Sequence, residues 1–379
     1  MSGKLNILYI SIREPHLRQG PTYSIPAQIK AQAKYDNVLW LNLVNSDNPS
    51  LKELFKQVDW KNLSYYKDLS DFPSPCLAQL PAPFNKPDLI VYEQFYLFAK
   101  HILFVRQIIK SDIPYIIVPR GEFTHSAQYH RAWKKKLVNF FFFSYFARHA
   151  KAIEYLTNQE KETSGPKWNK NGIVIPNGIT LPEISPKVYT KGKFIKLVYV
   201  GRLDIFHKGL DLLLQACVSV KEVLAQANVS LDIYGPDLWG FSTQLQNMIE
   251  TLGLQNIVRM HGPLYKGDKI KVLQQADVFI MTSRFEGHPM GLIEALAYGL
   301  PCVVTTGTNM RDEIDKFNAG WTADTTAESI ATALTKMLSE RDQLAIKSQQ
   351  ARTLASQYDW NQIAAKSHQI YEEIIRGNK

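Results

Sequence analysis

The chain has 379 residues, of which 45% are apolar and 11% aromatic, so it can bury an ample core and should divide into about two domains. With 21% charged residues, 20 Gly, 19 Pro and 3 Cys, the composition excludes collagenous, low-complexity and disulfide-framework proteins. The formal net charge is +9, and it is one-sided: residues 1–180 hold 23 basic and 14 acidic side chains, whereas residues 181–379 hold 21 of each. We therefore expect one domain to meet an anionic partner.

The three cysteines lie far apart without any C-x-x-C spacing, at Cys76, Cys217 and Cys302. This pattern predicts no zinc site and favours a reducing compartment. The apolar run Leu5–Ile10 is too short for a signal peptide, and no segment reaches the roughly 20 apolar residues that a membrane-spanning helix needs. We therefore expect a cytoplasmic protein, and peripheral contact with the inner face of the cell membrane stays open.

In the first half of the chain, short β-rich runs alternate with longer helical stretches. The expected strands are Asn6–Ser11, Val38–Leu43, Asp88–Tyr92, Tyr115–Pro119, Ala152–Leu156 and Ile173–Pro176. The alternation stops at Pro176-Asn177-Gly178, and residues 179–193, which contain Pro and Lys, are typical of a linker. We predict a first domain over residues 1–178.

The alternation of strands and helices then starts again. The expected strands are Ile195–Gly201, Val229–Gly235, Ile257–Gly262, Asp277–Ser283 and Pro301–Thr305. They are nearly continuous apolar runs, as expected of parallel strands that are covered on both faces. Two such arrays predict an α/β protein with two facing doubly wound (Rossmann-like) domains, residues 1–178 and 194–358, and the main ligand site in the cleft between them. We expect the last helix, within residues 359–379, to cross back to the N-terminal domain.

Two cations follow the strand Ile195–Gly201. Arg202 lies directly after it, and Lys208 precedes an amphipathic helix. An arginine offers a planar fork for phosphate oxygens and a lysine a compact charge, so the pair could neutralise a diphosphate without metal. Taken alone, a surface arginine and a loop lysine would explain the pattern equally well.

A second group of candidate residues follows the strand Asp277–Ser283. Glu286 in the loop and Glu294 in the next helix are carboxylates eight positions apart, and Pro289 can open that helix. Gly291 leaves the backbone bare at the first helical turn, where free N–H groups can receive a pyrophosphate. Because carboxylates accept hydrogen bonds from vicinal hydroxyls, one acid could hold each sugar of a nucleotide sugar.

These segments resemble family-four retaining glycosyltransferases of GT-B architecture, of the bacterial envelope polysaccharide type. The similarity is strong over residues 170–310 and rests on Val200-Gly201-Arg202-Leu203 with Lys208-Gly209, on Glu286-x7-Glu294, and on Ile175-Pro176-Asn177-Gly178. The resemblance implies that Arg202 and Lys208 bind the donor diphosphate, that Glu294 holds the nucleotide ribose, and that Glu286 faces the transferred sugar.

The resemblance also implies contacts from the helix that starts after Glu286. The backbone amides expected to meet the sugar or the phosphates are those of Met290, Gly291 and Leu292. Where most relatives carry Gly-Phe-Gly after the first Glu, this chain has Gly287-His288-Pro289-Met290-Gly291, so His288 joins the donor-binding candidates.

The nucleobase pocket is expected beside Gly235, His261 and Gly262, where glycine permits close backbone approach, although these glycines could equally serve only as tight turns. UDP is the commonest nucleotide in the resembling enzymes, so a UDP-hexose is the expected co-substrate. None of the 18 aspartates forms an Asp-x-Asp pair, and we therefore expect no metal and no further cofactor.

The first half holds a basic, aromatic segment. Residues 123–153 contain no acid, and the candidate acceptor or membrane contacts among their basic residues are Arg131, Lys134, Lys135 and Lys136. Such a segment could meet an anionic bilayer or a lipid-linked acceptor. It could equally be a buried helix whose lysines form a solvated rim.

Three further candidates lie in loops at the carboxyl ends of first-half strands. Arg120 and His125 follow the strand Tyr115–Pro119 and are expected to contact donor or acceptor, with His125 as a catalytic candidate. Gly20, in the loop after the first strand, would let the backbone approach a phosphate or sugar of the donor.

The sequence thus favours a hexosyltransferase that moves glucose from UDP-glucose to a glycan or lipid-linked acceptor, with Arg202, Lys208, Glu286 and His125 as its catalytic candidates. Two alternatives stay open. A nicotinamide-dependent dehydrogenase would need G-x-G-x-x-G after a first strand, which neither array has. A non-catalytic basic protein that binds nucleic acid or a membrane surface would explain the charge but not the two glutamates, and we expect no nucleic-acid partner.

Overall fold

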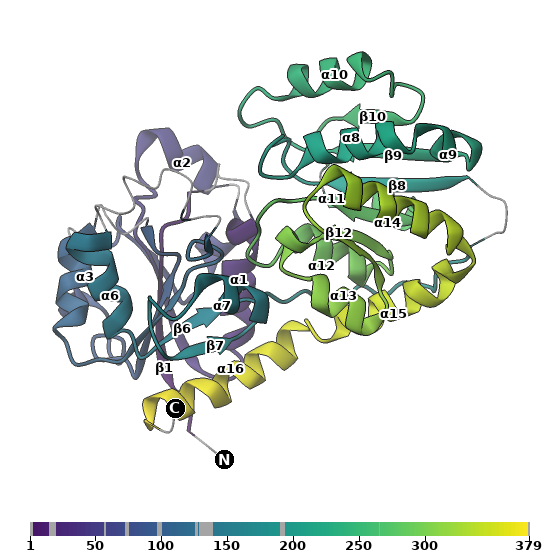
Figure 1. Cartoon of the computed structure of the whole chain (residues 1–379). Helices are drawn as coiled ribbons and strands as arrows, with labels where there is room; N and C mark the ends of the chain where they lie inside the picture. Colours follow the sequence, from purple (N-terminus) through teal and green to yellow (C-terminus); the bar gives the residue numbers. More distant parts are fainter. Residues whose placement is uncertain are drawn as a thin grey trace. The chain divides into compact units, whose positions relative to one another are not determined.

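The computed structural model of the protein, shown in Figure 1, describes residues 3–14, 20–56, 58–72, 76–96, 101–125, 128, 139–189, 194–264 and 266–377. Its internal contacts divide the chain into two compact units. The first unit comprises Met1–Gly178 and Trp360–Lys379, and the second unit is Ile179–Asp359. The described part of the expected linker, residues 179–189, therefore belongs to the second unit.

The first unit is built on one parallel sheet of seven strands in the order β3-β2-β1-β4-β5-β6-β7. The strands are β1 (Asn6–Ser11), β2 (Asn37–Asn42), β3 (Tyr66–Asp68), β4 (Leu89–Glu93), β5 (Tyr115–Val118), β6 (Ala152–Tyr155) and β7 (Gly172–Val174). Its described α-helices are α1 (Gly20–Gln32), α2 (Pro49–Phe55), α3 (Ile102–Ile109), α6 (Ser144–His149), α7 (Asn158–Ser164) and α16 (Trp360–Ile375).

The C-terminal helix α16 completes the first unit. It packs against α1, and Figure 1 shows it in yellow beside that unit. The ring of Trp360, the first residue of α16, lies so close to Gly178 that a Cβ there would approach a ring carbon to 2.4 Å. At the other end of the helix, the Tyr371 hydroxyl donates to Glu154 Oε2 at 2.8 Å. Residues far apart in the chain thus form one core.

The second unit contains one parallel sheet of six strands in the order β10-β9-β8-β11-β12-β13. The strands are β8 (Ile195–Val200), β9 (Val229–Tyr234), β10 (Val258–His261), β11 (Val278–Met281), β12 (Cys302–Thr305) and β13 (Gly320–Ala323). Its helices are α8 (Leu210–Ser219), α9 (Lys221–Gln226), α10 (Ser242–Thr251), α11 (Lys266–Gln275), α12 (Met290–Ala297), α13 (Arg311–Phe317), α14 (Ala327–Ser339) and α15 (Leu344–Ser356). The fold class predicted from the sequence, two doubly wound α/β domains, is confirmed.

The described end of the acid-free segment contributes to the first unit's core. A π-helical turn, Asn139–Phe143, leads into α6. Phe142, Phe143 and Phe146 are buried, whereas Tyr145 is 52% exposed. These three phenylalanines favour the buried interpretation of this end. The basic candidates lie outside the described residues, at Arg131, Lys134, Lys135 and Lys136.

None of the helices in the described part of the chain combines the length and apolar character needed to cross a membrane.

Candidate active site

The carboxyl ends of β8, β9 and β11 meet at one edge of the second unit's sheet, because the three strands are parallel and adjacent. Gly201 follows β8 and Gly235 follows β9, and a Cβ on Gly235 would lie only 1.7 Å from the Gly201 carbonyl oxygen. Helix α12 starts beside the same edge, since a Cβ on Gly291 would lie 3.0 Å from the Val200 carbonyl oxygen. Glycines therefore bring the loops of this edge together.

Lys208 and Glu286 form a buried ion pair at this edge. Lys208 is 8% exposed and lies in the turn after β8, whereas Glu286 lies in the loop after β11. Glu286 Oε1 also accepts a hydrogen bond from Ser283 Oγ at 2.8 Å. Burial is the largest single influence and would raise the pKa of Glu286. The Lys208 charge, a smaller effect of His207 and the hydrogen bonds from Lys208 and Ser283 together outweigh burial, and the pKa falls to about 2. Glu286 is therefore an anion at neutral pH, and it neutralises Lys208.

The turn that carries Lys208 is fixed to the loop that carries Glu286. Gly209 has a φ of +61°, and a Cβ there would lie 2.0 Å from the Thr282 carbonyl oxygen. The Thr282 hydroxyl donates back to the Gly209 carbonyl at 3.0 Å. The two terminal nitrogens of Arg284 donate to the two carboxylate oxygens of Asp211 at 2.7 Å each, and this joins the loop after β11 to α8.

Arg202 lies at the same edge, but its partners are rings. Its guanidinium carbon is 5.0 Å from the centre of the Trp239 ring, and Nη2 is 3.4 Å from Nδ1 of His207. Within the described part of the chain, no carboxylate forms an ion pair with Arg202. The two cations expected to act together thus differ: Lys208 is neutralised by Glu286, and Arg202 keeps its charge for a ligand.

Glu294 lies in α12, eight positions after Glu286, and is paired with Lys269 of α11. The side chains are 27% and 31% exposed, so the pair is half-buried, and the oxygen that faces Lys269, Oε2, is itself buried. Lys269 holds the carboxylate that was expected to accept hydrogen bonds from the ribose.

The start of α12 offers fewer donors than the sequence predicts. Met290 and Gly291 are its first two residues, so their N–H groups have no helical carbonyl one turn earlier. Leu292 is different: its N–H donates to the Pro289 carbonyl at 3.0 Å, and its side chain is fully buried. The prediction that the Leu292 amide binds the donor is therefore corrected, because that N–H is already used.

The prediction that His288 binds the donor is also corrected. Its side chain is 5% exposed, and its ring packs against Tyr358 with the centres 4.9 Å apart. Burial lowers the pKa of His288 to about 3, so the ring is neutral. We conclude that His288 supports the loop from inside rather than contacting a donor.

The expected nucleobase region carries an aromatic pair on the neighbouring strands β9 and β10. The rings of Tyr234 and His261 are stacked with centres 4.4 Å apart, and His261 Nε2 lies 2.7 Å from Asp232 Oδ1. A Cβ on Gly262 would meet nothing within 4 Å, so the backbone there is open. The two strand ends therefore present a flat face beside an accessible main chain.

In the first unit, Arg120 lies in a buried network rather than on an open edge. Its side chain is 2% exposed, and Nε forms an ion pair with Glu93 Oε2 at 2.7 Å. Its terminal nitrogens donate to Asn177 Oδ1 at 2.7 Å and to Gln28 Oε1 at 2.6 Å. The expectation that Arg120 contacts donor or acceptor is thus corrected, because its guanidinium instead ties β4, β5 and α1 together.

The other first-unit candidates lie on the surface. Gly20 is the exposed first residue of α1, and His125 is exposed after the turn that follows β5. Among the described residues, no group of three or more His, Cys, Asp or Glu side chains could hold a metal ion.

The site contains residues that the sequence pattern did not single out. Ser283 donates a hydrogen bond to Glu286. Asn309, in the turn after β12, donates from its side-chain amide to the Glu286 and Gly287 carbonyls. Lys269 binds Glu294 from another helix. Ser283 and His207 had a local signal, since Ser283 ends the predicted strand before Glu286 and His207 directly precedes Lys208. Lys269 and Asn309 come from segments without a motif.

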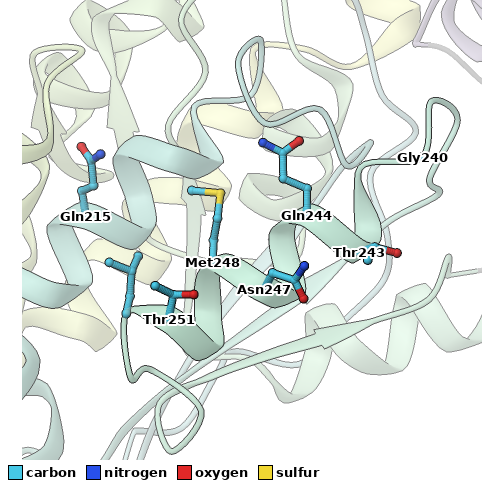
Figure 2. Close-up of a pocket in the computed structure, with 8 residues that line it drawn as sticks. Gln215, Gly240, Thr243, Gln244, Asn247, Met248 and Thr251 are labelled. Atoms are coloured by element: carbon cyan, nitrogen blue, oxygen red, sulfur yellow. The ribbon is translucent and has the colours of Figure 1, made fainter.

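A separate groove of about 570 Å³ lies between α8 and α10, as Figure 2 shows. Its lining has no charged side chain and consists of Gln215, Gly240, Thr243, Gln244, Asn247, Met248, Thr251 and Leu252. None of the residues expected to bind or react with a donor lies in it, so the groove is distinct from the edge described above.

Known proteins share the fold of the whole chain. Sucrose-phosphate synthase from Thermosynechococcus elongatus superimposes with a TM-score of 0.73 at 16% identity, covering 99% of this chain and 100% of that one. HepE from Anabaena superimposes with a TM-score of 0.71 at 16% identity, covering 97% and 100%. The architecture is therefore that of GT-B glycosyltransferases.

Sequence similarity is concentrated in the second unit. WcaL of Escherichia coli K12, a glycosyltransferase assigned by name to colanic acid biosynthesis, is 28% identical over 197 residues, 49% of this chain and 46% of WcaL. D-inositol 3-phosphate glycosyltransferase of Corynebacterium urealyticum is 28% identical over 180 residues, 46% of this chain and 42% of that protein. The chain thus spans less than half the length of these curated relatives.

The profile of one protein family covers the edge with Arg202, Lys208, Glu286 and Glu294. It is described as "Glycosyl transferases group 1" and matches residues 182–371, half of the chain. Of the three functions weighed from the sequence, this match supports the transferase, and the chain belongs to the group 1 glycosyl transferases.

Proposed function

We propose that the protein is a retaining, metal-independent glycosyltransferase that moves a hexose, with glucose from UDP-glucose as the first candidate, to a glycan or lipid-linked acceptor. The observation that carries this proposal is the Lys208–Glu286 pair beside Arg202 at the carboxyl edge of the second sheet. A fixed carboxylate suits sugar hydroxyls, and a guanidinium without a carboxylate partner suits phosphate oxygens.

The choice of a UDP-sugar is supported by proteins of the same fold. HepE has been solved with UDP and glucose, and the pneumococcal O-GlcNAc transferase GtfA with UDP and GlcNAc. In this chain, the stacked rings of Tyr234 and His261 offer a flat face for a base, and Glu294 offers oxygens for the ribose hydroxyls. Gly262 leaves room for the main chain to approach the base.

The proposed reaction is a front-face substitution at the anomeric carbon. The bond from C1 to the departing diphosphate oxygen breaks, and the acceptor oxygen bonds to C1 on the same face of the sugar. The acceptor's hydroxyl proton passes to the departing phosphate oxygen. Arg202 and the first N–H groups of α12, from Met290 and Gly291, stabilise the negative charge that develops on the diphosphate.

Glu286 has a binding role in this scheme. Lys208 and Ser283 both hold Glu286 Oε1, and the pKa of about 2 keeps the group ionised. The anion can accept hydrogen bonds from the hydroxyls of the transferred hexose and so orient C1. It is not required to attack C1, and no covalent glycosyl-enzyme is formed.

The acceptor is proposed from the relatives and the charge. WcaL is assigned by name to colanic acid biosynthesis, and this supports a glycan or lipid-linked acceptor in cell-envelope synthesis. The surplus of positive charge in residues 1–180 supports an acceptor that carries phosphate, or an anionic membrane surface nearby.

The test is a thermal-shift screen of the purified protein with UDP-, GDP- and ADP-sugars and NAD(H), each with and without EDTA. The proposal predicts that a UDP-hexose raises the melting temperature and that EDTA does not reduce the shift. Arg202→Ala should abolish most of the shift, whereas the matched surface variant Arg341→Ala should keep it. Stabilisation by NAD(H) alone, or by none of the nucleotide sugars, would contradict the proposal.

A further inference from the structure

His207 touches both loops of the candidate site. It lies in the turn after β8, where its N–H donates to Asp204 Oδ1 at 2.8 Å. Its ring stacks on Phe285 of the loop after β11, with centres 4.2 Å apart and planes 9° from parallel. The imidazole therefore lies between the segment that carries Arg202 and the segment that carries Glu286.

The partners of the two ring nitrogens determine the proton position. Nε2 lies 2.8 Å from the Phe285 carbonyl oxygen, which can only accept, so Nε2 carries the hydrogen. Nδ1 lies 3.4 Å from Arg202 Nη2, which can only donate, so Nδ1 is the acceptor. Both contacts are satisfied together only by the neutral Nε2–H tautomer.

We propose that His207 is a positioning residue of the transfer reaction: its neutral ring holds the Arg202 guanidinium with one nitrogen and the Glu286 loop with the other. The inference rests on the proposed function, because it gives Arg202 a diphosphate to stabilise. Through this one ring, the group that meets the leaving group and the group that orients the sugar keep a fixed separation.

A gained proton would reverse the Arg202 contact. The charged groups facing the ring are Arg202 and Lys208, which oppose protonation, and Glu286 and Asp204, which favour it. Burial is the largest influence, and it lowers the pKa of His207 below its usual value, so the ring is neutral at neutral pH. Once protonated, Nδ1–H would repel Arg202 and turn to Asp204 Oδ2, which lies 3.8 Å away. Acid should therefore release Arg202.

The first experiment measures UDP release from UDP-glucose by the full chain and by His207→Phe, which keeps the stacked ring and removes both nitrogens. Displacing a catalytic group lowers the rate on the order of ten- to a hundredfold. We therefore expect kcat to fall by at least about tenfold and the donor KM to change by less than about threefold. His149→Phe, a matched change at an exposed histidine of α6, should behave as wild type. An unchanged kcat in a folded His207→Phe protein would overturn the proposal.

The pH profile separates positioning from simple packing. The wild-type rate should fall in acid as His207 gains its proton, and the ratio of wild-type to His207→Phe rates should shrink toward one. A ratio that stays constant with pH would contradict the role of the neutral ring. If His207→Phe does not fold by circular dichroism, the same ratio is measured with His207→Gln.

A double-mutant cycle with Arg202→Lys tests the path of the effect. If His207 acts through the Arg202 guanidinium, His207→Phe should lower kcat by less than about threefold when Arg202→Lys is already present. Fully additive losses would overturn the Arg202 link. Failure of the wild-type protein to release UDP or another nucleoside diphosphate from any nucleotide sugar would instead refute the proposed function itself, so the two failures are distinguishable.

Discussion

The ion pair between Lys208 and Glu286 changes how the two cations of the site should be understood. A lysine beside a diphosphate would be expected to act as a free charge, but here its ammonium is buried against a carboxylate. Arg202, held by rings and by no carboxylate among the described residues, is then the group with an uncompensated charge. Lys208 acts first on Glu286, by keeping it ionised and fixed.

This arrangement predicts the behaviour of Lys208→Met. The change leaves Glu286 buried without its cation, so the pKa of Glu286 should rise and the free energy of unfolding should fall by about 3 kcal/mol. The double variant Lys208→Met/Glu286→Leu should recover much of that loss, because neither buried charge remains. Urea unfolding of the three proteins measures this. Equal stability of Lys208→Met and wild type would show that the pair is not buried as described.

Glu294 and Lys208 should differ in their effects on binding and rate. Glu294→Ala removes the carboxylate proposed for the ribose and should weaken UDP binding about tenfold, the value of one good charged hydrogen bond. Lys208→Ala should mainly slow transfer. Calorimetric titration with UDP measures the affinities, with the exposed Glu328→Ala of α14 as the matched control. Equal losses of UDP affinity in the two variants would refute the division.

At the scale of elements, the first unit contains a buried carboxylate that α16 covers. Glu154 of β6 is fully buried and accepts from Tyr371 of α16. Burial, aided by the nearby Glu93 charge, raises the pKa of Glu154 to about 8. The folded state therefore holds a proton that the unfolded chain has lost at neutral pH.

This shift predicts a pH dependence of stability. The pKa of Glu154 is higher in the folded state than in the unfolded chain. Its contribution to the free energy of unfolding is therefore complete below about pH 4 and is lost as pH rises through about 8. Each unit of difference between the two pKa values corresponds to about 1.4 kcal/mol. Glu154→Gln cannot ionise, so its free energy of unfolding should fall less between pH 5 and about 8 than that of wild type. Parallel curves for the two proteins would contradict the assignment.

The elements also show what the sequence could supply. Long apolar strands such as β1 and β8 were predicted within one residue, because strands buried on both faces are apolar throughout. The edge strands β3 (Tyr66–Asp68) and β13 (Gly320–Ala323) were missed, since they are short and contain charged or small residues. Their pairing comes from a neighbouring strand rather than from their own pattern.

The candidate site was predictable where its residues lie in local motifs. Arg202, Lys208, Glu286 and Glu294 each stand in a strand-loop-helix context that the sequence displays. Their interaction partners could not be predicted from the sequence. Lys208 and Glu286, for example, are 78 positions apart and meet only because the strands that precede them join one sheet. The prediction that Arg120 contacts donor or acceptor was wrong for the same reason, because this loop arginine is enclosed by residues of α1 and β4 that are distant in the sequence.

At the scale of the whole molecule, each unit has its own sheet and its own hydrophobic core. The first core is rich in aromatic side chains, with Phe95 in contact with the rings of Phe123, Phe143, Phe146 and Trp168. The second core is mostly aliphatic. Two separate cores predict two separable unfolding events.

The position of α16 sharpens this prediction. A chain ending at Asp359 loses a helix whose buried residues include Trp360, Tyr371 and Ile374, and each large core side chain is worth about 2–5 kcal/mol. The first unit should therefore melt at a lower temperature, whereas the second unit, Ile179–Asp359, should melt as before. Differential scanning calorimetry checks both transitions. A lower melting temperature for the second unit alone would contradict the assignment of α16.

The charge of the molecule divides in the same way. The second half holds equal numbers of basic and acidic residues, and its site uses placed groups rather than net charge to receive an anionic donor. The surplus of nine positive charges lies in residues 1–180. The proposed acceptor side is therefore the part of the molecule with long-range attraction for phosphate.

The most direct test of the central claim is UDP release from a panel of UDP-, GDP- and ADP-sugars, assayed in EDTA with wild type, Arg202→Ala and Glu286→Gln. The account predicts release from a UDP-hexose by the wild-type protein, with a rate at least about a hundredfold lower in both variants, since each loses a group that binds the transition state. Release that requires added metal, or that survives both substitutions unchanged, would contradict it.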